Sequence, residues 1–313
     1  MIWLLIKRVL STIPVIGLVG ILVFSLLYLS PGDPAAIIAG DNATTEEVDR
    51  IRVHLGLDLP LHSQFGKWVW RLMHGDLGQS IFSSLPVQRL ISQRLEPTIV
   101  LTVTTTVWVI LTAIPMGLLA AWRVGTWIDR SVMALTVIGF SFPSFVIGYI
   151  LIFGISVKLE WLPVQGYKPI ADGFLPFLRS IILPTLTLGL VYTALVARMT
   201  RASLLEILNQ DYMRTARAKG LSKTRIVLRH GLKNAAVPII TTLGAGIALL
   251  IGGVVVTESV FGIPGLGRLT VDAIVRRDYP VIQGVTLVFA VTYVFINLAV
   301  DLIYVMVDPR IQD

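Results

Sequence analysis

Six long apolar runs constrain the fold of this 313-residue chain more than any other feature of its sequence. A helix needs roughly 20 apolar residues to cross a bilayer, and most of these runs reach that length. Because 55% of the residues are apolar and only 14% are charged, an ordinary soluble domain is excluded. We therefore predict an all-α integral membrane protein with six transmembrane helices. The predicted spans cover about 9–29, 99–121, 132–157, 181–197, 237–257 and 281–307.

Lysine and arginine are concentrated in one segment, 198–236, which holds nine basic and two acidic residues and so carries +7, the formal net charge of the whole chain. Loops rich in Lys and Arg stay on the cytoplasmic side of a membrane. If both termini are cytoplasmic, the inside segments hold 14 basic residues in 61 positions, and the outside segments hold 12 in 114. We expect that orientation. Contact with the inner leaflet explains the charge better than binding to nucleic acid, so we expect a lipid partner and no nucleic-acid partner.

This topology divides the chain into three parts. Residues 1–29 are the cytoplasmic N-terminus and the first transmembrane helix. Residues 30–98 are too long for a simple turn, and we predict a small extracytoplasmic subdomain there, with a short helix capped by Thr44 or Thr45. Residues 99–313 form the core domain with five spans and the basic loop. Pro115 and Pro143 interrupt the second and third spans, and the backbone groups that they free need partners within a helix bundle or a wet cavity.

A short helix is predicted in the middle of the basic segment, over 211–220, ending at a glycine, which is a common helix stop. Tyr212, Ala216 and Lys219 share one stripe of this helix, and Thr215 lies beside them. Small residues let two backbones approach, and an aromatic ring fills a pocket. This stripe therefore suits a groove on another protein.

The same segment resembles a known family. Arg214-Thr215-Ala216, three further residues and Gly220 resemble the EAA loop of bacterial ABC-importer permeases. Arg214 and Thr215 stand where the general consensus has Glu and Ala, and Lys233 stands where it ends in Pro. These departures are typical of the dipeptide/oligopeptide/nickel branch. The resemblance covers nearly the whole chain. Within this branch, the sequence is most similar to the first permease of dipeptide or glutathione importers. Its other landmarks are 30–34, 55–58, 75–78, 277–280 and 307–310.

The resemblance implies a permease subunit in the bacterial inner membrane. A second, homologous permease would complete the pathway, two cytoplasmic ATPase subunits would bind ATP and Mg, and an extracytoplasmic solute-binding protein would deliver di- or oligopeptides or glutathione. In that family the EAA loop is the helix that docks on the ATPase. The residues that the resemblance assigns to this coupling are Asp211, Tyr212, Arg214, Thr215, Ala216, Arg217, Ala218, Lys219 and Gly220. A second helix is expected over 223–234, before the fifth span.

Ionisable residues in or near spans are candidates for the pathway or its gate, because burying them is costly and they face partners or water. Glu258 closes the fifth span, and Asp301 lies inside the sixth with Asn297 one turn away. A structural pairing is the alternative for both carboxylates, with Arg268 or Arg276 as partner for Glu258. Outside the membrane, the group Arg276-Arg277-Asp278-Tyr279 is a candidate for docking the binding protein; a solvated helix end is the alternative.

The sequence offers no catalytic residues and no metal site. It lacks a phosphate-binding loop with its lysine, so any ATP site must be on another chain, and we expect no cofactor in this one. The four histidines are scattered without metal-ligand spacing, and there is no cysteine. Nickel-chelate and opine importers share the branch and remain alternatives. An ion-coupled carrier working alone, with Asp301 as its carboxylate, and an intramembrane enzyme are alternatives of other classes.

Overall fold

The computed structural model describes residues 2–29, 33–39 and 43–307. Over these residues it contains helices and no β-strand. Five helices are long and apolar enough to cross a membrane, and one bent helix pair brings the number to six at most. The prediction of an all-α membrane protein is confirmed. The C-terminal residues 308–313, expected to be cytoplasmic, and positions 30–32 of the landmark 30–34 lie outside the described part.

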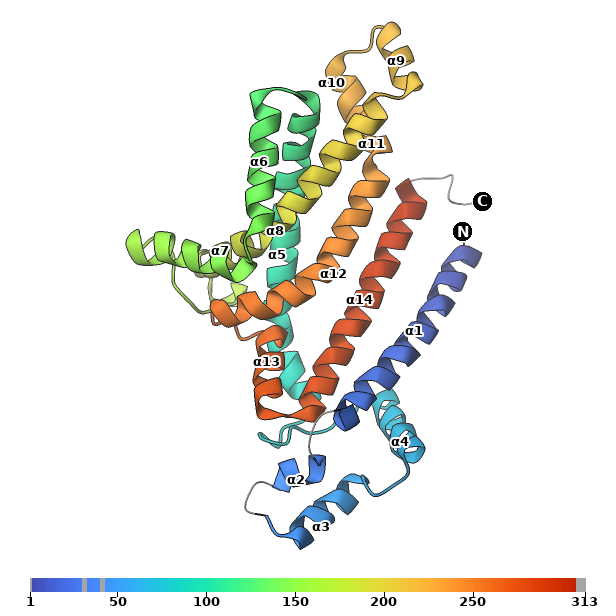
Figure 1. Ribbon diagram of the computed structural model, residues 1–313, viewed down its shortest axis with the longest axis vertical. Helices are drawn as coiled ribbons and strands as arrows, with labels where there is room; N and C mark the ends of the chain where they lie inside the picture. Colours follow the sequence, from blue (N-terminus) through green and yellow to red (C-terminus); the bar gives the residue numbers. More distant parts are fainter. Residues whose placement is uncertain (1, 30–32, 40–42, 308–313) are drawn as a thin grey trace.

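The five long helices run side by side (Figure 1). They are α1 (Ile2–Leu29), α5 (Val87–Trp122), α8 (Phe174–Leu208), α12 (Ala236–Val260) and α14 (Tyr279–Val307). The shorter helices are α2 (Pro34–Ala39), α3 (Thr45–Leu55), α4 (Leu61–Met73), α6 (Trp127–Ser141), α7 (Ser144–Leu151), α9 (Asp211–Ala218), α10 (Lys223–Arg225), α11 (Leu232–Asn234) and α13 (Leu266–Arg276). Two π-helical turns, η1 (Ile152–Lys158) and η3 (Ile226–Gly231), and one 3₁₀ turn, η2 (Ile170–Asp172), complete the set.

The molecule has two distinct ends. One carries α9, α10 and α11, and we call it the basic end. The other carries α2, α3, α4 and α13, and we call it the far end. Helix α1 begins and α14 ends toward the basic end, and the two helices pack against each other (Figure 1).

Helix α8 is the central helix of the bundle and is the most deeply buried of the apolar helices. Its closest neighbour is α5, and glycines bring the two together. A Cβ at Gly117 would lie 2.5 Å from the carbonyl oxygen of Ala197, and one at Gly189 would lie 2.6 Å from the ring of Trp108. Threonine hydroxyls also pair across the contact, Thr104 with Thr185 at 3.0 Å and Thr112 with Thr193 at 3.1 Å. Small residues and short hydroxyls thus hold these helices together where apolar burial alone gives no preference over lipid.

The predicted third span, 132–157, is not one helix. Helix α6 ends at Ser141, and the following α7 and η1 leave at an angle of 103°. Pro143 is the physical reason: it has no N–H to donate, and it disfavours the α-helical conformation for Phe142, which is extended here. The predicted interruption of the third span at Pro143 is thus present, and α7 projects sideways from the bundle (Figure 1). The interruption predicted at Pro115 is absent, because Pro115 lies inside the unbroken helix α5.

Two spans extend well beyond their apolar runs. Helix α5 begins at Val87, not near 99, and α8 continues to Leu208, beyond the predicted end at 197. Polar residues flank both apolar runs, but no glycine or turn sequence stops either helix there. Hydropathy marks the part of a helix suited to lipid, and the helix itself ends only where its hydrogen bonding ends.

The short helix predicted in the subdomain between the first two spans is α3, and its cap is Thr44. The Thr44 hydroxyl accepts the N–H of Glu47 at 3.3 Å, and the Glu47 carboxylate accepts the N–H of Thr44 at 2.8 Å. This reciprocal pair satisfies two donors that a helix start leaves open. Gly56 ends the helix in the left-handed conformation, with φ of 70°.

We expect the stability of α3 to fall in acid. Hydrogen bonds from the backbone and hydroxyl of Thr44 hold the pKa of the Glu47 carboxyl below its usual range. Because folding lowers this pKa, its stabilising effect is complete above the unfolded-state value and is lost as the pH falls through the folded-state value. Hydrogen–deuterium exchange over 43–55, corrected for intrinsic rates, should therefore quicken as the pH falls below about 5. The Glu47→Gln variant should lose this dependence; an equal dependence in both proteins would contradict the assignment.

Candidate functional site

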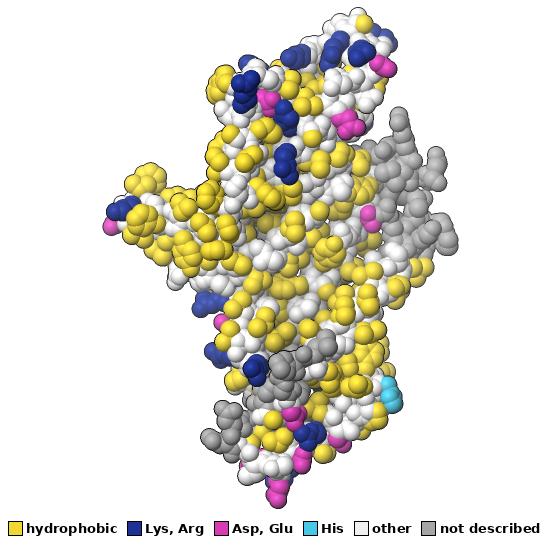
Figure 2. All heavy atoms as spheres, viewed as in Figure 1, with side chains coloured by type: hydrophobic (Ala, Val, Ile, Leu, Met, Phe, Trp, Pro, Cys, Tyr) yellow, Lys and Arg dark blue, Asp and Glu magenta, His cyan; other side chains and the backbone are white. Residues whose placement is uncertain are grey.

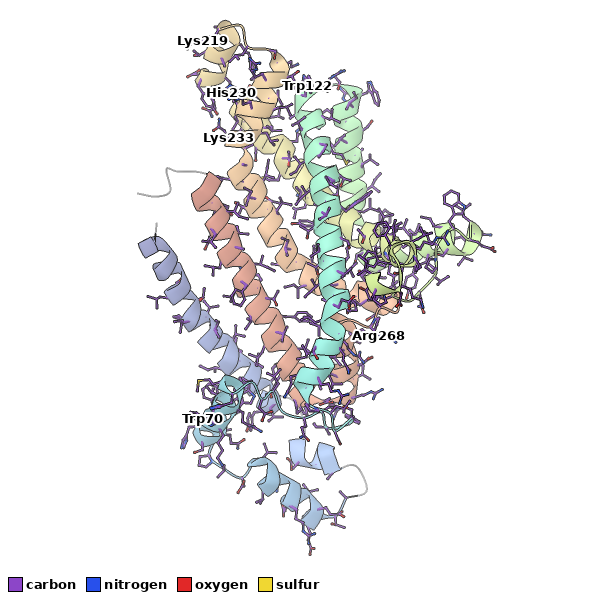
Figure 3. The ribbon with its side chains drawn as sticks, turned by 180° about the vertical axis from the view of Figure 1, so that it is seen from behind. Trp70, Trp122, Lys219, His230, Lys233 and Arg268 are labelled. Carbon is purple, nitrogen blue, oxygen red and sulfur yellow. The ribbon has the colours of Figure 1, made fainter. Side chains whose placement is uncertain are left out.

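The predicted docking helix is present at the basic end as α9. It begins at Asp211 and ends at Ala218, and Gly220 follows with φ of 79°. Only glycine adopts that left-handed conformation without strain, which is why the chain can turn back here. The prediction of a short helix stopped by a glycine is confirmed, and Figure 3 shows Lys219 at the tip of this end.

One face of α9 is attached to the rest of the molecule. Met213 is fully buried, although it is flanked by exposed residues. The Arg217 guanidinium donates to the carbonyl oxygen of Leu208 at 3.0 Å, at the C-terminal end of α8. Arg217 therefore helps to hold the helix in place. The sequence reasoning missed Met213, because it considered only the stripe that would face a partner.

The opposite face of α9 is open. Tyr212 is 48% exposed, Thr215 and Lys219 are exposed, and Ala216 is half-buried between them. Arg214 pairs loosely with Asp211 at 3.5 Å, and both side chains are exposed. An aromatic ring beside small residues, with cations around it, provides a shape that enters a groove and a charge that favours an acidic partner surface.

The segment after α9 supports it. The helix expected over 223–234 is present as α10, η3 and α11, which follow one another without a break and include a π-helical turn. Ile226 and Val227 of that turn are buried. The chain then enters α12, and Ala235, just before it, and Ile239 within it pack with Leu204 of α8. Helix α9 therefore rests on η3 and on the end of α8, and η3 leads through α11 into α12.

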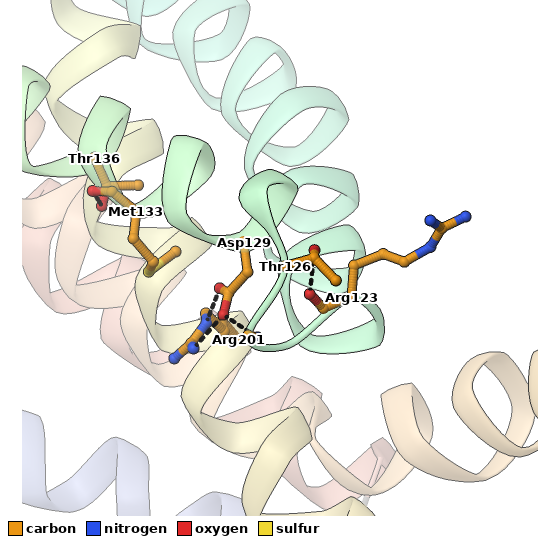
Figure 4. Close-up of polar contacts among 7 residues, drawn as sticks. Arg123, Thr126, Asp129, Met133, Thr136 and Arg201 are labelled. Atoms are coloured by element: carbon orange, nitrogen blue, oxygen red, sulfur yellow. Dashed lines mark hydrogen bonds and ion pairs between the residues drawn. The ribbon is translucent and has the colours of Figure 1, made fainter.

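An ion pair that the sequence reasoning did not find lies beside this support. The Arg201 guanidinium donates from Nε to Asp129 Oδ1 at 2.5 Å and from Nη2 to Oδ2 at 2.8 Å (Figure 4). Asp129 is buried and also accepts the N–H of Gly125 at 3.0 Å. The pair links the start of α6 to α8 across 72 positions of sequence. Arg201 is one of the nine basic residues of segment 198–236, and its charge is thus used in an ion pair within the protein.

Basic side chains gather over the basic end in the space-filling view, and the band between the two ends is mostly apolar (Figure 2). The exposed cations of this end include Arg214, Lys219, Lys223 and Arg225. Among the described residues, no group of three or more His, Asp and Glu side chains is placed to hold a metal ion.

The pathway candidates lie apart from one another. Glu258 is fully buried at the far end and accepts a hydrogen bond from Thr98. Asn297 is exposed on α14 and donates to the carbonyl of Tyr293 in its own helix at 3.0 Å. Asp301 is half-buried one turn further along α14 and has a polar or charged interaction of its own. The structure does not bring the three together, and their role in a pathway stays a prediction.

The candidate docking group 276–279 divides into two exposed and two buried residues. Arg276 and Arg277 are exposed, and Arg277 ends α13 in the left-handed conformation. Asp278 and Tyr279 are buried. Asp278 accepts the hydroxyl of Ser80 at 2.5 Å. Only the two arginines present charge to a partner.

Two cavities lie near the bent third span. One, of about 430 Å³, is lined by α5, α6, α7 and α8, including Trp108, Thr112 and Thr193. The other, of about 670 Å³, lies between the 160–168 loop and the start of α8. Tyr167 lines the second, and burial together with a hydrogen bond to Glu96 raises its pKa to about 12. None of the three pathway candidates lines either cavity.

Comparison with known families decides what kind of protein this is. Residues 113–313 match the family described as binding-protein-dependent transport system inner membrane component, and residues 1–102 match its N-terminal family. The chain belongs to this family. It is therefore a multi-pass inner-membrane protein of the transporter-permease type.

Relatives in the family match along the whole chain. A protein named probable peptide ABC transporter permease, from Sinorhizobium fredii, is 51% identical over 308 residues, which is 98% of each chain. The glutathione transport system permease protein GsiC of Escherichia coli is 46% identical, again over 98% of each chain. The inward-facing MetNI methionine ABC transporter has a chain with the same fold, with a TM-score of 0.58, 21% identity, and coverage of 71% of this chain and 97% of that one.

Proposed function

We propose that this chain is one permease subunit of an ATP-driven importer of dipeptides or oligopeptides, with glutathione as a possible cargo. The observation that carries the proposal is the open face of α9 on its fixed support at the basic end. Family membership supports the transporter assignment. The peptide and glutathione names of two relatives along the full chain support the class of cargo.

The basic end would face the cytoplasm, with both termini on that side. The excess of Lys and Arg supports this orientation, because such segments are retained inside. The 30–98 subdomain and α13 would then lie outside, where a solute-binding protein arrives, and Arg276 and Arg277 would be available to it. Membrane lipid would surround the apolar band.

The remaining parts of the machine would be on other chains. A second, homologous permease would complete the pathway, and two cytoplasmic ATPase subunits would hold ATP and Mg. This chain supplies no catalytic group in the proposal. Tyr212, Ala216 and their neighbours would dock on an ATPase. Closure of the ATPase dimer would push α9, and the push would reach the end of α8 through Arg217 and the start of α12 through η3. The bundle would then switch between inward and outward openings as packed bodies.

We expect Ala216→Trp to abolish the recovery of ATPase subunits when the tagged permease is pulled from its native membrane. Ala216 lies half-buried within the docking stripe, so an indole there blocks close approach without changing a span. Mass spectrometry of the recovered proteins makes the comparison, with Ala216→Ser as the matched variant of similar size. The partner permease should be recovered with all three proteins. If even the wild type brings down no ATPase, the importer proposal is wrong.

A further inference from the structure

The start of α13 is held by side chains from two other helices. Glu258 of α12 accepts the N–H of Arg268 on Oε2 at 3.0 Å and the hydroxyl of Thr98, from α5, on Oε1 at 2.5 Å. Thr98 in turn accepts the N–H of Leu266 at 2.8 Å. The first N–H groups of α13, which a helix start leaves open, are thus satisfied by a carboxylate and a hydroxyl.

Two glycines make room for this carboxylate. A Cβ at Gly265 would lie 2.1 Å from Glu258 Oε1, and one at Gly267 would lie 3.0 Å from Oε2 and 2.5 Å from the Cα of Val255. No other residue at either position would leave the contact intact. Glu258 is 0% exposed, and both of its oxygens are occupied, so it faces protein on every side.

The C-terminal end of α13 is fixed as well. Asp278, just beyond its end, accepts the hydroxyl of Ser80 at 2.5 Å and the N–H of Ile81 at 3.2 Å. Between the two ends, buried residues of α13 pack against α5 and α14. This contact consists of Leu266, Leu269 and Ala273 with Val87, Ile91, Val281 and Val285. The exposed face of α13, which includes Val275, is left open at the far end.

We propose that Thr98 and Glu258 lock α13 to α5 and α12, so that this connecting helix moves rigidly with the spans and transmits force from its exposed face to them. The proposal rests on the proposed function, in which a binding protein reaches the far end. Glu258 is then a positioning residue that acts through α13, and substrate contact is not its role. Leaving a buried carboxyl oxygen or backbone N–H without its hydrogen-bond partner is costly.

The lock is tested with Thr98→Val and Glu258→Gln in the full transporter complex in lipid nanodiscs. Thr98→Val keeps the shape of the side chain and removes the hydroxyl that donates to Glu258 and accepts the N–H of Leu266. Thr102→Val is the matched control, because its hydroxyl donates to the Thr98 carbonyl within the same helix at 2.8 Å. Hydrogen–deuterium exchange of the N–H groups of 266–268 should quicken about tenfold or more in Thr98→Val and in Glu258→Gln, but not in the control.

The same variants in liposomes give the functional readout. The amount of glutathione or alanylalanine taken up per ATP hydrolysed should fall in proportion to the fraction of molecules in which α13 is released from α5 and α12. Basal ATP hydrolysis should stay unchanged. Unchanged exchange in Thr98→Val overturns the lock. Faster exchange with unchanged uptake per ATP overturns the transmission. If the wild type takes up neither probe, the proposed cargo is wrong, and faster exchange in the variant still supports the lock.

Discussion

Replacing Gly246 by alanine should prevent normal assembly of the bundle. A Cβ at this position of α12 would lie 1.7 Å from Cε2 and 2.2 Å from Cζ of Tyr192 on α8. The ring cannot easily move aside, because Tyr192 is 4% exposed and its hydroxyl donates to the Leu243 carbonyl. Overpacking typically costs about 1–3 kcal/mol, and an approach of 1.7 Å to a fixed ring places this variant at the upper end of that range or above it. The yield of folded protein after detergent extraction, and its midpoint of thermal aggregation, measure the effect.

The same helix supplies the control. A Cβ at Gly252 would meet nothing within 4 Å, and this residue is exposed. Gly252→Ala should be neutral or stabilise the helix by up to about 1 kcal/mol, because alanine is the better helix former. Combining Gly246→Ala with Tyr192→Leu should recover part of the loss. Equal stability of the Gly246→Ala and Gly252→Ala proteins would contradict the close packing of α8 and α12.

Removing the carboxylate of Asp129 should destabilise the basic end by about 3 kcal/mol, the lower limit for breaking a buried ion pair. The lower limit applies because the Arg201 side chain is 25% exposed. Asp129→Asn leaves this guanidinium without its countercharge beside the start of α6. Thermal midpoints of the purified permease should therefore fall by several degrees, since roughly 3 kcal/mol is a large fraction of the stability of a protein.

Two comparisons make the result specific. Arg130 is the exposed neighbour of Asp129, and Arg130→Met should change stability by no more than about 0.5 kcal/mol. The double variant Asp129→Leu with Arg201→Met should be more stable than Asp129→Asn, because an apolar pair leaves no uncompensated charge. A midpoint for Asp129→Asn equal to that of wild type would show that the pair contributes nothing.

The parts of the site that depend on local sequence were predictable. The helix over 211–218 and its glycine stop follow from spacing within ten residues, and the Thr44 cap follows from a glutamate three positions later. Contacts between distant positions were not. Thr98 and Glu258 are 160 positions apart, and nothing near either residue indicates the other.

The fold was predictable to a similar degree. Apolar runs locate the bilayer portion of each long helix, but they do not indicate where the helix itself begins or ends. The start of α5 and both ends of α8 were therefore missed, whereas the end of α5 was predicted to within one residue. Pro143 indicated an interruption of the third span. The angle of 103° depends on how α6 and α7 pack against α8, which a one-dimensional pattern does not contain.

The length of α8 has a mechanical consequence. At 1.5 Å per residue its 35 residues form a rod of about 52 Å, compared with a hydrocarbon thickness of about 30 Å. One end of the rod lies beside the 160–168 loop and the other contacts α9 through Leu208. A tilt of about 10° around its midpoint displaces each tip by roughly 4.5 Å in opposite directions. Such a lever converts a small push on one membrane surface into a comparable displacement at the other.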